Sequence, residues 1–155
     1  ESCDLLRQYF DDPAITTDLI TGFPEETEEE FAQTLDFIRA CDFARMHIFP
    51  YSRRTGTPAA ALPGQVPKAE KEARARRAAA VAEEMHRSYL EGCVGRTYPV
   101  LFEQPKNGKF FGHAPNYMEV LVDGAELHNA LRTVRIIDVD GEALLGEIVE
   151  QEAEA

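Results

Sequence analysis

Residues 17–31 read TDLITGFPEETEEEF, and this stretch decides the fold of the first half of the chain. Its β-branched beginning, within Ala14 to Thr21, predicts a short strand. Gly22-Phe23-Pro24 predicts a turn. Thr27 can cap the start of a helix, and the three glutamates after it suit the positive end of the helix dipole. Apolar residues at helical spacing carry this helix to about Ala40.

The flanking residues extend the pattern. Leu5 to Phe10 predicts the end of a helix, which Pro13 terminates because proline has no amide donor. Ala44 to Tyr51 predicts a second strand, so the segment reads strand–helix–strand with a right-handed parallel crossover. Ser52 to Pro67 holds three prolines and two glycines in 16 residues, which predicts a loop without regular structure.

The second half begins with a long helix, predicted from about Lys68 to Glu91, with an apolar stripe at Val81, Met85 and Tyr89. After Gly95 the pattern changes to short strands. They are predicted at Tyr98–Phe102, Lys109–His113, Tyr117–Val122, Thr133–Val139 and Ala143–Val149. Turn signals separate several of them, Asn107-Gly108 being the strongest. About five short strands in about 55 residues predict a small antiparallel barrel of the OB-like kind.

Length and composition exclude several classes of protein. The chain has 155 residues, of which 44% are hydrophobic and 28% charged, so most of it should be globular. It is too short for a complete (β/α)₈ barrel, which needs about 250 residues. Its apolar runs fall short of the about 20 residues of a membrane span. The start, Glu1-Ser2-Cys3-Asp4, has neither a secretory signal nor an initiator Met, so we expect a processed product or a fragment.

The net charge of −12 is unevenly distributed. Residues 1–50 carry −9, residues 51–92 carry +3 and residues 93–155 carry −6. The acidic total argues against a generic nucleic-acid binder, but a local basic segment sets the local potential. We expect the acidic tail, residues 150–155, to be disordered.

The cysteines are few and scattered. Cys3, Cys41 and Cys93 lack the close spacing of zinc or iron–sulfur ligands. An odd number also argues against a disulfide framework. We therefore expect three reduced thiols in a cytosolic protein and no metal site.

Two segments together resemble a known family. Residues 17–31 are similar to the signature D-x-I-x-G-F-P-G-E-T-E-E-x-F, and residues 47–60, HIFPYSRRTGTPAA, to Y-S-x-R-x-G-T-x-A. These signatures belong to the radical S-adenosylmethionine (SAM) tRNA methylthiotransferases, and the second segment most resembles the bacterial MtaB type, which modifies threonylcarbamoyladenosine. Residues 93–149 resemble the TRAM domain of these enzymes, matching at Val100-Leu101-Phe102-Glu103, Gly112, Asn116-Tyr117 and Val134.

The resemblance implies an α/β fold followed by a small barrel. Residues 1–67 would be the last strand–helix–strand units of a TIM-like radical SAM barrel, 68–92 a linker helix and 93–149 the TRAM domain. The family holds two [4Fe–4S] clusters, one by a C-x₃-C-x₂-C motif absent from this chain, so the cluster ligands would lie outside it. The chain alone is expected to be inactive. Glu25 departs from the family pattern, which has Gly there, and would strain the turn if that position needs a positive φ.

The resemblance also implies a SAM site at the strand ends, where barrel enzymes place their sites. Ile20 would line the adenosine by apolar contact, and Gly22 by close backbone approach. The other expected SAM contacts are Asp18, Phe49, Pro50, Tyr51 and Ser52. The alternative for Ile20 and Gly22 is ordinary strand packing. His47 is interpreted as a hydrogen-bonded barrel histidine rather than an acid–base group.

The tRNA contacts are expected in two places. Arg53 and Arg54 follow a strand end, where two guanidiniums suit phosphate recognition; the alternative is exposed solubilising arginines. In the TRAM-like part we expect Lys109, Phe111, His113, Tyr117 and Arg132 to bind RNA, by stacking and charge. The alternative is that the aromatic residues fill the barrel, and alternation sends one of Phe110 and Phe111 inward.

The function that the resemblance implies is tRNA methylthiolation at C2 of a modified adenosine beside the anticodon. SAM would yield the radical that removes the C2 hydrogen, and a second SAM would methylate the inserted sulfur. The expected partners are the tRNA anticodon stem-loop and the remainder of the same polypeptide, with no membrane or DNA partner, in the cytoplasm. The alternatives are a non-catalytic TRAM-type RNA-binding module and a truncated product without function of its own.

Overall fold

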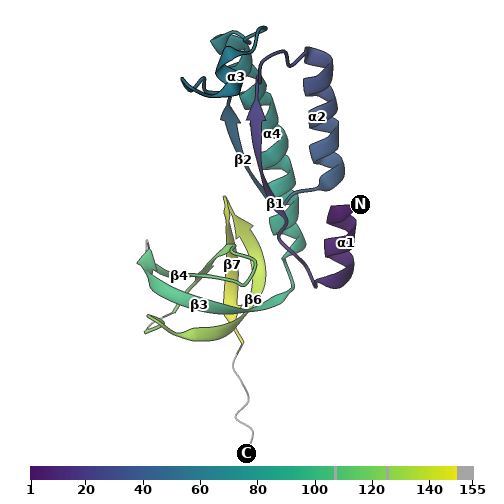
Figure 1. Cartoon of the computed structure of the whole chain (residues 1–155). Coiled ribbons are helices and arrows are strands. Elements are labelled where there is room, and N and C mark those ends of the chain that lie inside the picture. The colour runs from purple at the N-terminus through teal and green to yellow at the C-terminus, as the bar shows by residue number, and fades with distance from the viewer. Residues whose placement is uncertain (107, 125, 150–155) are drawn as a thin grey trace, which may run out of the picture. The chain divides into compact units, whose positions relative to one another are not determined.

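The computed structural model describes residues 1–106, 108–124 and 126–149. The chain divides into two compact units, unit 1 (Glu1–His86) and unit 2, which begins at Arg87 (Figure 1). Residues 150–155, for which disorder was predicted, lie outside the described residues, and so does Asn107 of the predicted hairpin turn. Among the described residues, no helix is both long and apolar enough to cross a membrane.

Unit 1 is a two-stranded parallel sheet with helices. Strand β1 pairs with β2 in a continuous register from Thr16 opposite Arg45 to Thr21 opposite Pro50. The predicted strand–helix–strand order is therefore confirmed. The elements of this part of the chain are α1 (Ser2–Tyr9), β1 (Thr16–Thr21), α2 (Glu28–Cys41), β2 (Arg45–Pro50), α3 (Pro58–Ala61) and α4 (Lys68–Gly92).

Thr27 caps the start of α2, as predicted, and the structure shows that it does so through a capping box with Glu30. The Thr27 hydroxyl accepts a hydrogen bond from the Glu30 amide at 3.1 Å, and the Glu30 carboxylate accepts one from the Thr27 amide at 2.8 Å. The hydrogen bond from the Thr27 backbone holds the pKa of the Glu30 carboxyl below its ordinary value. The turn between β1 and α2 therefore ends at a defined residue.

One hydrophobic cluster forms the core of unit 1. Its buried members are Phe31, Leu35, Ile38, Phe43, Ala78, Val81 and Met85, from α2, α4 and the residues just before β2. Leu19, Met46 and Ile48 of the sheet pack against it from one side. Val81 and Met85 confirm the apolar stripe predicted for α4. Tyr89, the third residue of that stripe, is only half-buried, and the fully buried residue of this turn is Leu90.

The prediction that residues 52–67 lack regular structure is wrong at one place. Pro58 to Ala61 form a short helix, α3, capped by Thr57, whose hydroxyl accepts a hydrogen bond from the Ala60 amide at 3.3 Å. Proline is compatible with this position because the first turn of a helix needs no amide donor. The first helix also begins at Ser2, earlier than the Leu5 at which its pattern becomes visible.

Unit 2 contains a closed five-stranded barrel with the order β3-β4-β5-β7-β6. Its strands are β3 (Thr97–Lys106), β4 (Lys109–His113), β5 (Glu119–Val122), β6 (Leu131–Asp140) and β7 (Ala143–Ile148). The pair β5–β7 is parallel and the other pairs are antiparallel. The buried side chains that fill the barrel include Val100, Phe102, Val120, Val122, Val134, Ile136 and Leu144. The predicted OB-like barrel is confirmed. Its one parallel pair arises because β5 and β7 are joined through β6, so the chain returns beside β5 in the same direction.

Candidate functional site

The β1–β2 sheet has one face covered by the core of unit 1 and one exposed face. Leu19 of β1 and Met46 and Ile48 of β2 face that core. Because side chains alternate along a strand, the residues next to them on each strand point away from the core. The residues exposed on this face are Thr16, Asp18 and Ile20 of β1 and Arg45, His47 and Phe49 of β2. We call these six residues the open sheet face.

The strand register places the residues of the open sheet face in pairs. Asp18 lies opposite His47, with 3.4 Å between Asp18 Oδ1 and His47 Nδ1, and Ile20 lies opposite Phe49. The side chains of Asp18 and His47 are 72% and 67% exposed, so both remain hydrated. An exposed pair of this kind contributes little to the stability of the fold. The open sheet face therefore combines a carboxylate–imidazole pair with two half-exposed apolar side chains, Ile20 and Phe49.

Three of the expected SAM contacts, Asp18, Ile20 and Phe49, thus lie together. Pro50 alternates to the other side of β2 and pairs with the buried Thr21. Ser52 is exposed in the loop beyond the strand. The structure therefore divides the predicted SAM contacts into one group on the open sheet face and a second group at the strand end.

Tyr51 is held at the end of β2 by three contacts. Its amide donates to the Thr21 carbonyl at 2.8 Å, and its own carbonyl accepts a hydrogen bond from Lys71 Nζ at 2.7 Å. Its ring meets the ring of Phe23 edge to face at a centroid distance of 5.3 Å. The Tyr51 hydroxyl is buried with no hydrogen-bond partner among the described residues. A buried polar atom without a partner is uncommon and suits a place where a bound molecule completes the contacts.

Gly22, at the end of β1, is required by packing within unit 1. Its φ is +69°, and a Cβ at this position would lie 2.2 Å from the Cβ of Lys71 on α4. Its amide donates to Glu26 Oε2 at 2.7 Å. The close backbone approach expected at Gly22 is therefore already used by α4, and contact with an adenosine there stays a prediction.

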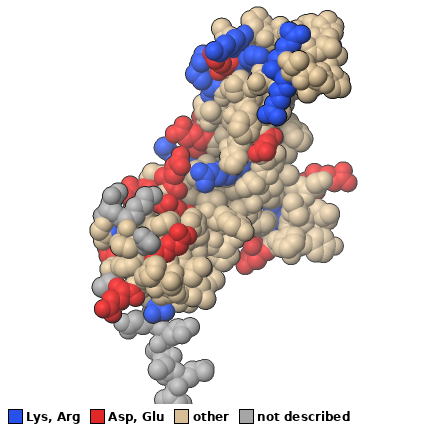
Figure 2. Space-filling model, turned by 60° about the vertical axis from the view of Figure 1, so that its left-hand side comes forward, with Lys and Arg blue, Asp and Glu red and all other residues tan. Residues whose placement is uncertain are grey.

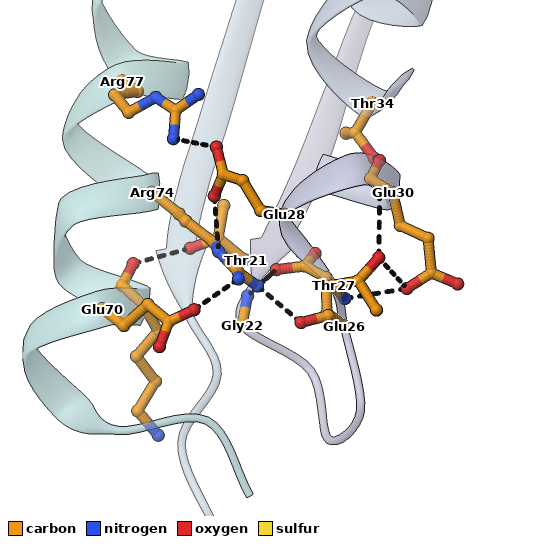
Figure 3. Close-up of polar contacts among 11 residues, drawn as sticks. Thr21, Gly22, Glu26, Thr27, Glu28, Glu30, Thr34, Glu70, Arg74 and Arg77 are labelled. Atoms are coloured by element: carbon orange, nitrogen blue, oxygen red, sulfur yellow. Dashed lines mark hydrogen bonds and ion pairs between the residues drawn. The ribbon is translucent and has the colours of Figure 1, made fainter. Parts of the chain in front are cut away.

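Arg74 of α4 is buried at the centre of a polar cluster (Figure 3). Its Nη1 donates to the carbonyl oxygen and to Oε2 of Glu26, at 2.8 and 2.7 Å. Its Nη2 donates to Glu70 at 2.5 Å, and its Nε lies 3.6 Å from Glu28 Oε2. Burial of a charge is costly unless it is paired, and here three carboxylates surround the guanidinium.

The Arg74 cluster and the neighbouring Lys71 together fix the ends of both strands to α4. Glu26 Oε2 accepts hydrogen bonds from Arg74 and from the Gly22 amide, so it joins the end of β1 to the helix. The Thr21 hydroxyl donates to the Lys71 carbonyl at 3.1 Å, and Lys71 reaches the end of β2 through Tyr51. Arg74 was not among the predicted site residues. Glu70, one helical turn earlier on the same face, indicates an ion pair but not the contact with Glu26.

Glu25 has the positive φ that the family glycine led us to expect. Its φ is +69°, in the left-handed region that a side chain disfavours. Its amide donates to the Gly64 carbonyl at 2.8 Å. Gly64 itself has a φ of +64°, and a Cβ there would lie 2.7 Å from Glu25 Cγ. The turn after β1 is thus held by Gly64 as well as by Arg74.

Basic side chains gather where α3 and the start of α4 lie (Figure 2). Arg53, Arg54 and Lys68 are exposed there. Arg53 Nε donates to the Ala60 carbonyl at 2.8 Å, which orients its guanidinium and leaves the Nη edge as the part that can meet an anion. The Arg54 carbonyl accepts a hydrogen bond from the Thr57 hydroxyl at 2.8 Å, which fixes the backbone of Arg54 just before α3.

In unit 2 the outer side of β4 carries Lys109, Phe111 and His113 in one row. Phe111 pairs across the strands with Leu121, whereas Phe110 pairs with the buried Val122, so Phe110 is the ring that faces inward. Lys109 Nζ lies 3.5 Å from Asp123, and His113 Nδ1 lies 3.1 Å from Glu103. Because Lys109 and His113 each already have a carboxylate beside them, the row offers aromatic surface rather than net positive charge.

The other two expected RNA contacts of unit 2 lie apart from this row. Tyr117 is 83% exposed, with a φ of +62°, in the turn before β5. Leu101 of β3 pairs with His113, and Leu131 of β6 pairs with Leu101, so these two residues continue the row of β4 across the sheet. Arg132 is the next residue of β6 and pairs with Val100. Its exposed side chain therefore points to the opposite side of the strand from Leu131. The structure thus brings together Lys109, Phe111 and His113 but does not place Arg132 with them.

The cysteines of this chain do not fit an iron–sulfur cluster. Such a cluster takes four ligands, usually thiolates. Cys3 and Cys41 lie in unit 1, and Cys93 is buried in unit 2. The described residues contain no group of three or more His, Cys, Asp or Glu that could hold a metal ion. No step of the chemistry is therefore assigned to a cluster here.

These features define a class: a parallel α/β unit with an open sheet face, combined with an OB-like barrel. No protein-family model matches the chain. It is 40% identical over 148 residues to the tRNA-2-methylthio-N(6)-dimethylallyladenosine synthase of Maricaulis maris, a match covering 94% of this chain and 32% of the relative. It is 38% identical over 118 residues to the threonylcarbamoyladenosine tRNA methylthiotransferase MtaB of Bacillus subtilis, covering 73% of this chain and 26% of the relative.

A third relative is the tRNA-2-methylthio-N(6)-dimethylallyladenosine synthase of a Jannaschia species, 36% identical over 94% of this chain and 32% of the relative. The homologues of this chain are therefore tRNA methylthiotransferases. The chain spans about a third of the length of these curated relatives or less.

Proposed function

We propose that this chain is the C-terminal part of a tRNA methylthiotransferase, an enzyme that adds a methylthio group to C2 of a modified adenosine beside the anticodon. The observation that supports this most is that the similarity to such enzymes extends over 94% of the chain, through both units. The reaction also needs iron–sulfur clusters, whose ligands lie in the remainder of the polypeptide. This chain alone is therefore inactive, and the complete enzyme works in the cytoplasm.

The open sheet face is the SAM-binding part of this chain. Ile20 and Phe49 offer half-exposed apolar surface to the adenosine, and the exposed Asp18 carboxylate can accept hydrogen bonds from hydroxyl or amino groups. SAM bound there would be the source of the radical that removes the C2 hydrogen, and a second SAM molecule would supply the methyl group. The role of this chain is to place the cofactor: α4 fixes Gly22 and Tyr51, and these residues limit the site at the strand ends.

The anticodon stem-loop of tRNA meets two surfaces. Arg53 and Arg54 offer guanidinium groups to phosphates beside the strand ends, in a segment of net positive charge. Phe111 and His113 on β4 offer ring surface to unpaired bases, with Lys109, Tyr117 and Arg132 as further contacts of unit 2. Phosphate binding is therefore concentrated in unit 1, and base stacking in unit 2.

The substrate is threonylcarbamoyladenosine rather than dimethylallyladenosine. The support for this choice is the segment 47–60, whose sequence most resembles the MtaB type, and an MtaB enzyme is among the relatives. Relatives named for dimethylallyladenosine match at similar identity, so the two substrates must be separated by assay.

The test is nucleoside analysis of tRNA. The full reading frame that contains this chain is expressed in bacteria lacking methylthiotransferases, and tRNA nucleosides are separated and weighed by mass spectrometry. The proposal expects the methylthio derivative of threonylcarbamoyladenosine. The methylthio derivative of dimethylallyladenosine would overturn the substrate choice alone. The absence of both derivatives, with the protein folded and its clusters loaded, would overturn the enzymatic function.

A non-catalytic RNA-binding module is the second candidate, and the aromatic row on β4 favours it. Such a module binds RNA without altering it. The two candidates differ in the same assay, because a module binds tRNA and leaves its nucleosides unchanged.

A further inference from the structure

Two of the three cysteines of the chain contact each other in unit 1. Cys3 lies in the first turn of α1, and Cys41 is the last residue of α2. Both are free, half-buried thiols that pack against the same hydrophobic core, and the Cys3 thiol is near enough to Cys41 to shift the pKa of the Cys41 thiol. Because each sulfur is the other's neighbour, the pair can react together.

An independent contact holds this pair in place. Arg7 lies one helical turn after Cys3, on the same face of α1. Its Nη2 donates to the Cys41 carbonyl at 2.7 Å and to the Asp42 carbonyl at 2.6 Å. These carbonyls belong to the C-terminal end of α2, where backbone acceptors lack partners within the helix. Arg7 therefore anchors the face of α1 that carries Cys3 to the end of α2 that carries Cys41.

We propose that Cys3 and Cys41 are a redox-reactive pair that forms a reversible disulfide when the protein meets hydrogen peroxide. In the first step the Cys3 sulfur, after loss of its proton, attacks the peroxide. The O–O bond breaks, a sulfenic acid forms on Cys3 and one water leaves. In the second step the Cys41 sulfur attacks the sulfenic sulfur, the S–S bond forms, the S–O bond breaks and a second water leaves with the Cys41 proton. The two thiols lose two electrons, and the peroxide gains them.

The environment of Cys41 suits the second step. Burial and the neighbouring Cys3 thiol raise the pKa of the Cys41 thiol, so this thiol keeps its proton to a higher pH than usual. Cys41 therefore reacts slowly with peroxide itself, and it attacks the sulfenic acid on Cys3 as its own proton passes to the departing hydroxide. The disulfide would close a loop of the chain from Cys3 to Cys41 and so hold α1 on α2.

Cys93 provides the internal control. It lies in unit 2, is 1% exposed, and its sulfur is contacted by the Asn116 side chain at 3.8 Å. Burial protects such a thiol from peroxide. Trypsin also separates the three cysteines: Cys3 lies in the peptide that ends at Arg7, Cys41 in residues 40–45 and Cys93 in residues 88–96.

The experiment is peptide mapping after oxidation. The native protein is treated with hydrogen peroxide, remaining thiols are alkylated, and the digest is analysed by mass spectrometry without reductant. We expect the Cys3 and Cys41 peptides as one cross-linked species, two hydrogens lighter than their sum, that dithiothreitol separates. It should be lost in Cys41→Ser and kept in Cys93→Ser. Alkylated Cys3 and Cys41 after treatment, over-oxidised Cys3 without a cross-link, or pairing of either with Cys93 would overturn the proposal.

A second measurement does not depend on mass spectrometry. The oxidised protein should unfold at a higher urea concentration than the reduced protein, because the cross-link restricts the unfolded chain. Cys41→Ser should show no shift with oxidation, and Cys93→Ser should show the full shift. An equal shift in Cys41→Ser would overturn the assignment of the pair.

Discussion

Arg74 donates hydrogen bonds from Nη1 to both the carbonyl oxygen and the carboxylate of Glu26, a residue 48 positions earlier in the chain. The same Glu26 carboxylate accepts the amide of Gly22 (Figure 3). A buried guanidinium on α4 is thereby joined through one carboxylate to the end of β1. This relationship explains how a short turn rich in carboxylates keeps a fixed shape next to the proposed cofactor face.

Replacement of Arg74 should be strongly destabilising. We expect Arg74→Met to lower the free energy of unfolding by about 3 kcal/mol or more, because loss of the buried guanidinium leaves the Glu26 carboxylate, whose side chain is only 15% exposed, without its cation. The measurement is urea unfolding followed by circular dichroism. The matched control is Arg77→Met on the same helix, whose side chain is 49% exposed, with an expected loss of about 1 kcal/mol or less. Equal losses in the two variants would contradict the role given to Arg74.

Replacement of Glu25 by glycine, the family residue at this position, should stabilise the protein. Glycine adopts a positive φ without the steric cost that Glu25 bears at +69°, so Glu25→Gly should raise the free energy of unfolding by about 0.5–1 kcal/mol. Gln33→Gly, at an exposed position within α2, should lower it by about 1 kcal/mol, as glycine does inside helices. The measurement is thermal unfolding of both variants and of the parent protein. A loss of stability in Glu25→Gly would contradict the claim that the backbone at Glu25 is strained.

The capping box of α2 should make stability depend on pH. The folded-state pKa of Glu30 is lowered by its hydrogen bonds from Thr27, so the unfolded state binds its proton more readily. The stabilisation by this carboxylate is therefore fully present well above pH 4.5 and is lost as the pH falls through the lowered folded-state pKa. The stability gap between the parent and Glu30→Gln should narrow over that range. Glu29→Gln in the same helical turn is the control. A gap for Glu30→Gln that stays constant with pH would show that the capping carboxylate is not the source.

The two arginines after β2 should contribute to tRNA affinity through phosphates. In the intact enzyme, Arg53→Ala with Arg54→Ala should weaken tRNA binding and reduce the slope of log affinity against log salt by about 0.7–0.9 per lost phosphate contact. Arg39→Ala removes an exposed arginine of α2 that is 3.5 Å from Asp36, and binding should then be unchanged. Fluorescence anisotropy with an anticodon stem-loop at several salt concentrations measures both. An unaltered slope in the double variant would remove these residues from the interface.

The elements of the fold were largely predictable because their signals are local. Thr27 and the glutamates after it define the start of α2 within four residues of sequence. Alternation along the strand also predicted that one of Phe110 and Phe111 faces inward, and the register shows that it is Phe110. The short helix α3 was missed because proline usually indicates a loop, although it is also compatible with the first turn of a helix. At Pro58 only the preceding Thr57, which caps α3, indicates the helix.

The site was only partly predictable because its contacts are not local. Asp18, Ile20 and Phe49 were expected from the resemblance, and the β1–β2 register then brought them onto one face. Nothing in the residues around Arg74 indicates that it would be buried against Glu26, since that contact depends on how α4 packs on the sheet. Gly22 was expected near a ligand, yet the close contact in the structure is with Lys71.

The central claim is that the open sheet face holds SAM, and direct binding to the intact, anaerobically reconstituted enzyme tests it. Calorimetry is carried out with Ile20→Asp and with Thr16→Asp, another exposed position of the open sheet face that lies at the beginning of β1, away from the strand end where the site is proposed. We predict that Ile20→Asp weakens SAM binding by about tenfold or more, which corresponds to about 1.4 kcal/mol, because a carboxylate replaces apolar contact with the adenosine. Thr16→Asp should leave the affinity unchanged. Equal affinities of the parent and both variants for SAM would contradict the claim.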